Sequence, residues 1–274
     1  MGIQIILLDL DGTLLTTEKT VSPATRAALD RAAARGIHIV PCTGRLYQGI
    51  PQAVRELPYV RYAAAVNGAQ IYDAQEDRVL YRAEIPPEAA ERLYDYFETF
   101  PAIFDCYMDG WGYMPSDHYA RIDEYILDPK IAALARRTRK PLEDFRGYMR
   151  REGGPLQKTQ VFFNDPERRR LELTRLAEKF PEMSVTSSLP FNIEINIREA
   201  NKGAALRFLC RHLGIDERDS MAFGDGSNDV SMLRAAGIGV AMGNSDQEAL
   251  AAADYVTGTN DSDGVAEAIE RFCL

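Results

Sequence analysis

The chain has few of the residues on which many catalytic and metal sites depend. It contains only three histidines and four cysteines among 274 residues. The cysteines, Cys42, Cys106, Cys210 and Cys273, are far apart and lack the paired spacing of metal ligands, so we expect buried free thiols and neither disulfides nor zinc. The histidines are equally scattered. Chemistry in this protein therefore depends on carboxylates, lysine and hydroxyl groups.

Long apolar runs and excess positive charge are also missing. No run approaches the roughly 18 to 20 apolar residues of a membrane span, and "MGIQIILLDLDG" lacks the basic start and cleavage site of a signal peptide. We therefore expect a cytoplasmic protein. The net charge of -9 argues against nucleic acid or an anionic membrane as partner, because both are bound chiefly through Lys and Arg. An anionic small substrate is compatible with this charge where the site is locally positive.

What the chain does contain is a regular alternation of strands and helices near its start. The composition, 46% hydrophobic and 27% charged, is that of a globular protein. The run "IQIILLDL" predicts a buried strand, and "IHIVPCTG" predicts a second one. Between them, "SPATRAALDRAAARG" predicts a helix with Ser22 as its N-cap, Pro23 in its first turn and Gly36 just past its end. A helical stretch from about Leu46 to Glu56 and the apolar run "AAAVNG" follow. This alternation predicts an α/β fold with a doubly wound parallel sheet.

The pattern changes in the middle of the chain. Aromatic, strand-like segments such as "AIFDCYMDGWGYM" and "KTQVFFN" mix with helices there, which predicts a separate α+β unit. Alternation returns with "NKGAALRFLCRHLG", "SMAFGDG" and "SNDVSMLRAAG". The simplest interpretation is an α/β core of residues 1–82 and 198–274, interrupted by an inserted domain of residues 83–197. Within the insertion, the basic cluster "LARRTRKPL" is typical of a solvated helix face.

Two carboxylates, Asp9 and Asp11, follow the first predicted strand in the motif "DLDGT". Open α/β sheets bind ligands at the carboxyl ends of their strands, so this is a place where a site is expected. Asp and Gly also form ordinary turns. However, neighbouring carboxylates at a buried strand end repel each other and need a counter-charge, which a divalent cation can supply.

Two further places carry groups that suit an anion. In "CTGR", Thr43 and the backbone amides around Gly44 can hold an oxyanion, and Arg45 can reach a charged substrate, although a plain strand-to-helix turn also explains Thr43 and Gly44. Lys202 stands at the start of a helix that Asn201 can cap. A cation there opposes the helix dipole, and the chain has lysine at only six positions.

The fourth place is "FGDGSND", which ends a predicted strand and opens a helix. Asp225 and Asp229 can join Asp9 around a hard cation, and Asn228 can donate a hydrogen bond to a phosphoryl oxygen. Taken alone, the motif also fits a loop with a helix cap. The glycines of "GIGVAMG" do not indicate dinucleotide binding, because Gly237 ends a helix and precedes a strand, the reverse of the required order.

The order "DLDGT", "TGR", a lone lysine and "GDGSND", with a domain inserted between the second and third, resembles the haloacid dehalogenase superfamily of phosphohydrolases, and more narrowly its Cof-type branch. "AVNGAQIYD" and "GVAMGNSDQEALAAADYVT" extend the resemblance over the whole chain. The resemblance implies that Asp9 is the nucleophile that becomes an aspartyl phosphate, and that Asp11 is the general acid and base. It also implies an Mg²⁺ ion held by Asp9, the backbone carbonyl of Asp11 and Asp225, with Asp229 in support.

The same resemblance implies that Thr43, Lys202 and Asn228 grip the phosphoryl oxygens and that the insertion is a cap that selects the leaving group. The expected activity is Mg²⁺-dependent hydrolysis of a small phosphorylated metabolite, such as a sugar phosphate, flavin mononucleotide, pyridoxal phosphate or a nucleotide. A phosphotransferase or mutase would use the same intermediate. A noncatalytic sensor of phosphorylated metabolites is the third hypothesis, against which the acid–base residue Asp11 argues. The sequence predicts no oligomeric state.

Overall fold

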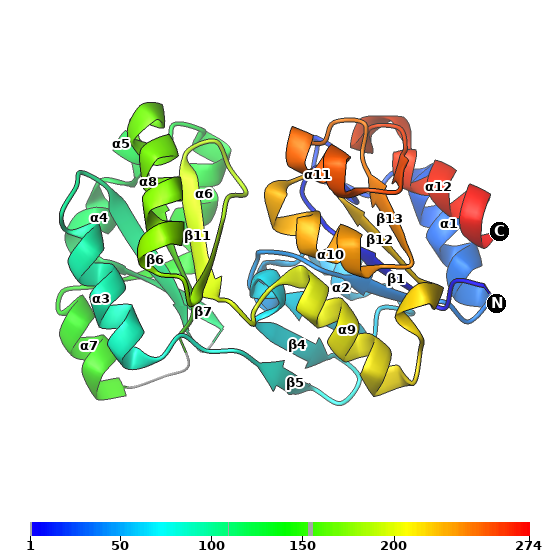
Figure 1. The fold of residues 1–274 in the computed structure, drawn as a ribbon, viewed down its shortest axis with the longest axis horizontal. Coiled ribbons are helices and arrows are strands. Elements are labelled where there is room, and N and C mark those ends of the chain that lie inside the picture. Colours follow the sequence, from blue (N-terminus) through cyan, green and yellow to red (C-terminus); the bar gives the residue numbers. More distant parts are fainter. Residues whose placement is uncertain (1, 109, 153–155) are drawn as a thin grey trace. The chain divides into compact units, whose positions relative to one another are not determined.

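The computed structural model describes residues 2–108, 110–152 and 156–274 (Figure 1). The chain forms two compact units. The first comprises Met1–Tyr81 and Asn201–Leu274, and the second comprises Arg82–Ala200. Among the described residues, no helix combines the length and the apolar character that a membrane crossing requires.

A parallel sheet forms the centre of the first unit. Its strand order is β14 (Tyr255–Val256), β13 (Ile238–Ala241), β12 (Ser220–Gly224), β1 (Ile5–Leu8) and β2 (His38–Pro41). Every neighbouring pair in this sheet is parallel. The strands β3 (Tyr62–Ala65), β4 (Gln70–Asp73) and β5 (Arg78–Arg82) form a second, smaller sheet. An isolated bridge between Cys42 and Ala64 joins the two sheets.

Helices cover both faces of the parallel sheet, as the sequence predicted. Ile6 and Leu8 of β1 pack against α1 (Pro23–Ala34) and α12 (Gly264–Cys273). Ile5 and Leu7, which point the opposite way, pack against α9 (Lys202–Leu213) and α10 (Val230–Ala235). A strand that is buried on both faces has no solvent side, which explains why all four residues of β1 are apolar. The remaining helix of this unit's carboxyl half is α11 (Gln247–Ala252).

The helical prediction for residues 46–56 is wrong in detail. The structure has a 3₁₀ turn at Tyr47–Gly49 and a separate short helix α2 at Gln52–Arg55. Pro51 lies between them. Its missing N–H cannot donate within a continuous helix, and its ring favours an extended backbone at the preceding residue. Ile50 accordingly has φ -68° and ψ 129°.

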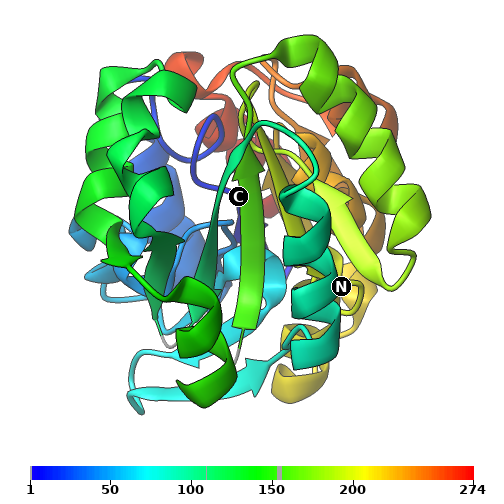
Figure 2. The same ribbon diagram turned by 90° about the vertical axis from the view of Figure 1, so that its left-hand side faces the viewer.

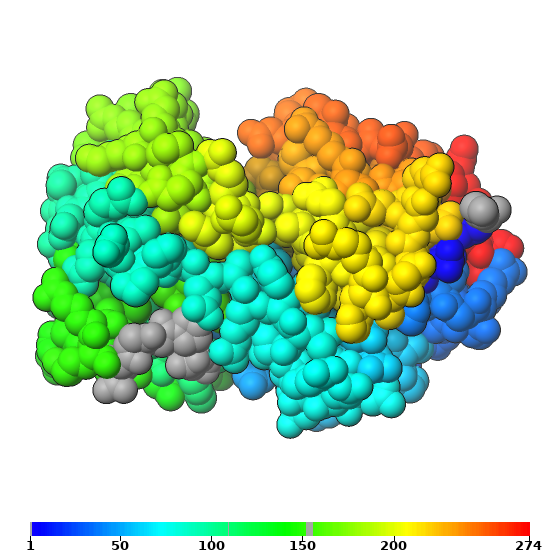
Figure 3. All heavy atoms as spheres, turned by 60° about the horizontal axis from the view of Figure 1, so that its bottom comes forward, coloured from blue at the N-terminus to red at the C-terminus, as the bar shows by residue number. Residues whose placement is uncertain are grey.

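Hairpin β4–β5 packs beside α9 in the first unit. The rings of Tyr81 in β5 and Phe208 in α9 have centroids 5.2 Å apart. Figure 3 shows cyan atoms of the hairpin region beside the yellow atoms of α9. This hairpin therefore extends the apolar cluster that Ile5 and Leu7 begin on this face of the sheet.

The second unit is built around a six-stranded sheet (Figure 2). Its strand order is β10 (Met183–Thr186), β11 (Asn192–Ile197), β9 (Leu156–Phe162), β6 (Ile103–Met108), β7 (Trp111–Pro115) and β8 (Arg139–Leu142). The pairings are antiparallel except for that of β7 with β8. Its helices are α3 (Pro87–Phe97), α4 (Ser116–Ala120), α5 (Ile122–Tyr125), α6 (Pro129–Thr138), α7 (Phe145–Glu152) and α8 (Pro166–Lys179). The predicted α+β character is confirmed.

The two faces of this second sheet differ in polarity. Phe104 and Cys106 of β6 belong to an apolar cluster with α3 and α8. Asp105, between them, is fully buried and accepts a hydrogen bond from Arg139 Nε at 2.7 Å. The expectation of a solvated helix face for "LARRTRKPL" is therefore wrong for Arg139, which opens β8 and whose side chain is only 9% exposed. The buried carboxylate of Asp105 stabilises the guanidinium there.

Candidate active site

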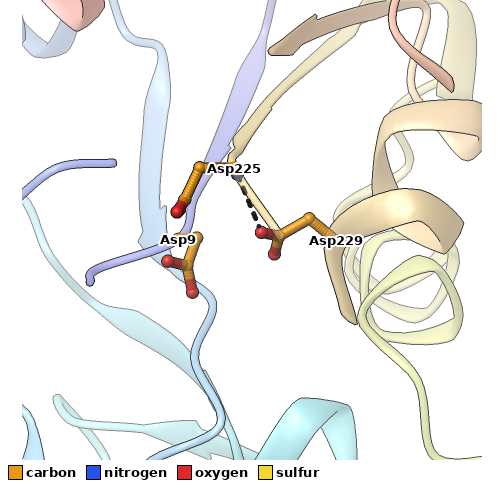
Figure 4. Close-up of side chains that lie close together, drawn as sticks. All are labelled: Asp9, Asp225 and Asp229. Carbon is orange, nitrogen blue, oxygen red and sulfur yellow. Dashed lines mark hydrogen bonds between the residues drawn. The ribbon is translucent and has the colours of Figure 1, made fainter. Parts of the chain in front are cut away.

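Three aspartates converge at the carboxyl end of the parallel sheet (Figure 4). Asp9 follows β1, while Asp225 and Asp229 follow β12, the strand hydrogen-bonded beside it. One carboxylate oxygen from each lies within 4.8 Å of the other two. Asp9 and Asp229 are buried, and Asp225 is partly buried. Parallel strands bring their carboxyl ends to one edge, so two motifs more than 200 positions apart in the sequence meet here.

The glycine and threonine of "DLDGT" hold Asp225 in place. Gly12 has a left-handed backbone, φ 83°, and a Cβ added there would lie 2.3 Å from Asp225 Oδ2. Only glycine suits both the backbone and the close approach. The Thr13 hydroxyl donates to Asp225 Oδ1 at 2.7 Å. Asn244 secures the same turn by donating from Nδ2 to the Gly12 carbonyl at 2.8 Å.

Lys202 lies between two of the three carboxylates. Its Nζ donates to Asp9 Oδ1 and to Asp229 Oδ1, each at 2.5 Å, and its side chain is fully buried. The other oxygen of Asp229 accepts from the backbone N–H groups of Asp225 at 2.9 Å and Gly226 at 3.0 Å. Asp229 thus fixes both the lysine and the loop that carries Asp225.

The charges in this cluster do not balance. Burial raises the pKa of the Asp9 carboxyl well above its ordinary value, against the opposing charge of Lys202. Burial also raises the pKa of Asp225 to about 7, and the Asp229 carboxylate adds to that rise. For Lys202, burial acts to lower the pKa, but Asp229 and Asp9 outweigh it and the pKa rises well above its ordinary value. Three carboxylates around one ammonium leave an excess of negative charge, which a divalent cation can neutralise.

Asp11 points to different partners. Arg45 donates to it through Nε at 2.7 Å and through Nη2 at 2.6 Å, a two-pronged pair, and Lys19 Nζ donates at 2.8 Å. Burial acts to raise the pKa of the Asp11 carboxyl, but the hydrogen bonds and charges of Arg45 and Lys19 outweigh it and lower the pKa. Asp11 is therefore held as a carboxylate in this arrangement.

Comparison with known proteins identifies the family. Residues 6–269 match the model of the haloacid dehalogenase-like hydrolase family. The chain belongs to this family. A 5-amino-6-(5-phospho-D-ribitylamino)uracil phosphatase of Bacillus subtilis, YcsE, is 29% identical, with 100% of this chain and 97% of the relative covered. A pyridoxal phosphate phosphatase of Escherichia coli, YbhA, is 29% identical, with 98% of each chain covered.

A solved structure of a haloacid dehalogenase-like hydrolase from B. subtilis superposes with a TM-score of 0.85 at 28% identity and covers 98% of this chain and 99% of its own. The predicted superfamily, fold and class of enzyme, a phosphatase, are thereby confirmed. In the present chain, the parallel sheet and its flanking helices bring the four predicted motifs together at the carboxyl end of the sheet.

The remaining predicted residues of this hydrolase lie in the loops beside the carboxylates. Thr43 is buried, and its Oγ1 accepts a hydrogen bond from the Arg45 backbone N–H at 3.2 Å. Gly44, between them, is partly buried. Asn228 Nδ2 donates to Asn67 Oδ1 at 3.3 Å. Arg45, which the sequence analysis assigned to a charged substrate, is paired here with Asp11.

The sequence analysis did not single out two residues that contact the candidate site residues, Lys19 beside Asp11 and Asn67 beside Asn228. Lys19 is one of only six lysines and follows "DLDGT" closely, which was a usable signal. Asn67 belongs to an Asn-Gly pair, which is typical of left-handed turns. Neither signal tells which side chain the residue contacts, because both contacts are made across loops that only the fold brings together.

Proposed function

We propose that this hydrolase is an Mg²⁺-dependent phosphatase that acts on small phosphorylated metabolites through an aspartyl phosphate on Asp9. The observation that carries the proposal is the buried cluster of Asp9, Asp225 and Asp229, whose charge Lys202 balances only in part. A phosphate ester brings further negative charge. Carboxylates and a phosphoryl group can share one site only where cations offset their repulsion.

The residues fit a magnesium ion. The ligands are oxygens, which hard cations prefer, and they stand close enough to share one ion. We assign the ion to Asp9, the backbone carbonyl of Asp11 and Asp225. Asp229 would support this site indirectly, because its two oxygens already accept from Lys202 and from two backbone amides. When bound, Mg²⁺ supplies a positive charge that stabilises the phosphoryl group in the transition state.

Asp9 is the proposed nucleophile. Lys202 holds Asp9 Oδ1, and the Asp9 backbone N–H donates to the Phe223 carbonyl at 3.0 Å, so the carboxylate has a fixed position. A carboxylate oxygen of Asp9 attacks phosphorus while the ester oxygen leaves with the electron pair of the broken bond. Water then attacks the aspartyl phosphate, releasing phosphate and restoring the carboxylate.

Asp11 is the proposed acid and base. It gives a proton to the leaving oxygen in the first step and takes one from the attacking water in the second. In the arrangement seen here, Arg45 and Lys19 favour its ionised form. The acid step therefore requires Asp11 to exchange at least one of these partners for the substrate. Arg45 and Lys19 then serve to return it to a defined position.

The phosphoryl oxygens are assigned to Lys202, Asn228, Thr43 and the backbone around Gly44, with Arg45 nearby. The relatives YcsE and YbhA are named for phosphate esters of a ribitylaminouracil and of pyridoxal. Both of these esters carry a nitrogen-containing heterocycle. We propose substrates of this class, or sugar phosphates of similar size, and we assign selection of the leaving group to the second unit, Arg82–Ala200, as a cap.

A panel of phosphate esters tests the proposal. We expect release of inorganic phosphate in the presence of Mg²⁺ and its loss after chelation with EDTA, restored by added Mg²⁺. An acceptor alcohol added to the same assay distinguishes hydrolysis from transfer, through the ratio of new ester to free phosphate. Tight binding of esters without turnover would identify a sensor and refute the enzyme mechanism. Full activity of the chelated protein would refute the metal assignment.

A further inference from the structure

The segment that follows β3 has an unusual backbone. Val66, Asn67 and Gly68 have φ values of 54°, 57° and 88°, so three consecutive residues are left-handed. This conformation is unfavourable for L-residues and is a true outlier for a β-branched valine. Such backbone strain persists only where neighbouring structure enforces it, and it concentrates at functional sites. The neighbours of this segment therefore show what it does.

Backbone contacts join this turn to the "CTGR" loop. The Val66 N–H donates to the Arg45 carbonyl and the Asn67 N–H donates to the Thr43 carbonyl, both at 2.9 Å. Thr43 is one of the residues assigned to the phosphoryl group. The left-handed turn thus fixes the backbone of the loop that carries it.

The same turn contacts the two other loops assigned to the phosphoryl group. A Cβ added to Gly68 would lie 2.5 Å from the carbonyl oxygen of Asn201, the residue directly before Lys202. Asn67 Oδ1 accepts the hydrogen bond from Asn228 Nδ2 at 3.3 Å, and Asn67 is only 4% exposed. One short turn therefore lies against all three loops, from three distant parts of the chain.

We infer that Asn67 is a positioning residue, which orients the Asn228 amide toward the transferring phosphoryl group. An amide NH₂ group has two hydrogens. In this arrangement Asn67 Oδ1 accepts one of them, which turns the Asn228 nitrogen toward Asn67 and leaves its second hydrogen for a phosphoryl oxygen. Without this acceptor, the Asn228 amide can rotate and present its oxygen, which repels phosphate. This inference rests on the proposed function, because it takes Asn228 as a phosphoryl ligand.

The variant Asn67→Gly tests the side chain without disturbing the backbone, since glycine adopts φ values near 60° readily. We expect kcat/KM to fall about tenfold, the effect of one orienting hydrogen bond. The factor is the same for a nitrophenyl phosphate and an alkyl phosphate, because the phosphoryl group is common to both. Inhibition by inorganic phosphate weakens in parallel.

Asp77→Gly is the matched control. Asp77 is also left-handed, with φ 49°, and its carboxylate accepts a hydrogen bond from Tyr72 in the β4–β5 turn. The variant removes the side chain of a residue with left-handed backbone, together with its hydrogen bond, elsewhere in the same unit. We expect its kcat/KM to equal that of the wild type. A loss in both glycine variants would indicate a general effect on stability and would overturn the positioning role.

A double-mutant cycle with Asn228→Ala decides whether Asn67 acts through Asn228. We expect the double variant to be no slower than Asn228→Ala alone, because the amide to be oriented is already gone. Losses that multiply, or wild-type kinetics in Asn67→Gly, would overturn the inference. If Asn67→Gly does not fold, Asn67→Ser, whose hydroxyl is too short to replace the amide oxygen, takes its place in the cycle. Asp9→Asn, run alongside, separates the two proposals: activity in that variant refutes the proposed function itself.

Discussion

Each unit of the protein contains a buried charged cluster, and the two clusters differ in balance. In the second unit, Arg139 pairs with Asp105 and Lys158 Nζ lies 3.0 Å from Glu194 Oε1, so each cation has a carboxylate. In the first unit, Lys202 faces Asp9 and Asp229, with Asp225 beside them. In the balanced network each buried charge has its counter-charge within the protein. An unbalanced one needs a further ion, and this need distinguishes a site from a structural network.

The largest expected effect comes from Asp9→Asn in the unbalanced cluster. The carboxamide is a poor nucleophile and a weaker metal ligand, so we expect turnover to fall by at least ~10³-fold with the fold intact. Steady-state kinetics measure the loss, and circular dichroism with a thermal melt controls for folding. Normal turnover by a folded variant would remove Asp9 from the mechanism.

Asp11→Asn is expected to separate the two chemical steps. With a nitrophenyl phosphate the leaving group needs no proton, so the aspartyl phosphate still forms, whereas its hydrolysis slows by roughly 10² to 10⁴-fold. Rapid mixing is expected to show a burst of about one nitrophenolate per site, followed by slow turnover. An alkyl phosphate gives no burst, because its first step also needs the acid. Equal behaviour of the two esters would mean that Asp11 is not the shared acid and base.

The unbalanced cluster also predicts how stability depends on pH without metal. The pKa of Asp225 is raised to about 7, above that of an unfolded aspartate near 4. Between these values the folded state binds more protons, so the stability of the metal-free protein falls as the pH rises from about 4 to about 7. We expect Asp225→Asn to flatten this slope in urea titrations. Mg²⁺ is expected to stabilise the wild type at pH 7 more than the variant.

In the balanced cluster of the second unit, we expect the loss of one partner of an ion pair to lower stability more than the loss of both. Removing one partner, in Glu194→Gln, leaves Lys158 buried opposite a neutral group and is expected to destabilise the protein by about 3 kcal/mol. Replacing both, in Lys158→Met with Glu194→Leu, is expected to restore most of this loss. Urea unfolding measures both changes. A double variant less stable than the single one would show that the ion pair itself stabilises the protein, in addition to avoiding an unpaired buried charge.

The parts of the fold that the sequence predicted depend on local signals. The all-apolar run of β1 requires burial on both faces, and Ser22 caps α1 by accepting from the Thr25 N–H at 3.1 Å. Pro51 is an equally local signal. The prediction of one helical stretch over residues 46–56 did not allow for the break that this proline causes. Arg139 was not predictable in this way, because the carboxylate that allows its burial lies 34 positions earlier, on another strand.

The candidate site likewise combines residues that local signals predict with contacts that depend on distant parts of the chain. The identity of the carboxylates and of Lys202 could be predicted, since each follows a strand or opens a helix. The pairing of Arg45 with Asp11 and of Asn67 with Asn228 could not, because these contacts span 34 and 161 positions and depend on loop conformation. Left-handed backbone at Val66 has no signature in the side chain itself.

The position of Asp9 at the end of β1 has a consequence for heat inactivation. β1 pairs with both β2 and β12, so it is an interior strand of the sheet, and the Asp9 amide donates to the Phe223 carbonyl. Amides in such central strands exchange with solvent only when the whole cooperative unit opens. The Asp9 amide is therefore expected among the slowest to exchange deuterium in the protein, and warming will abolish activity at the temperature where the entire first unit unfolds.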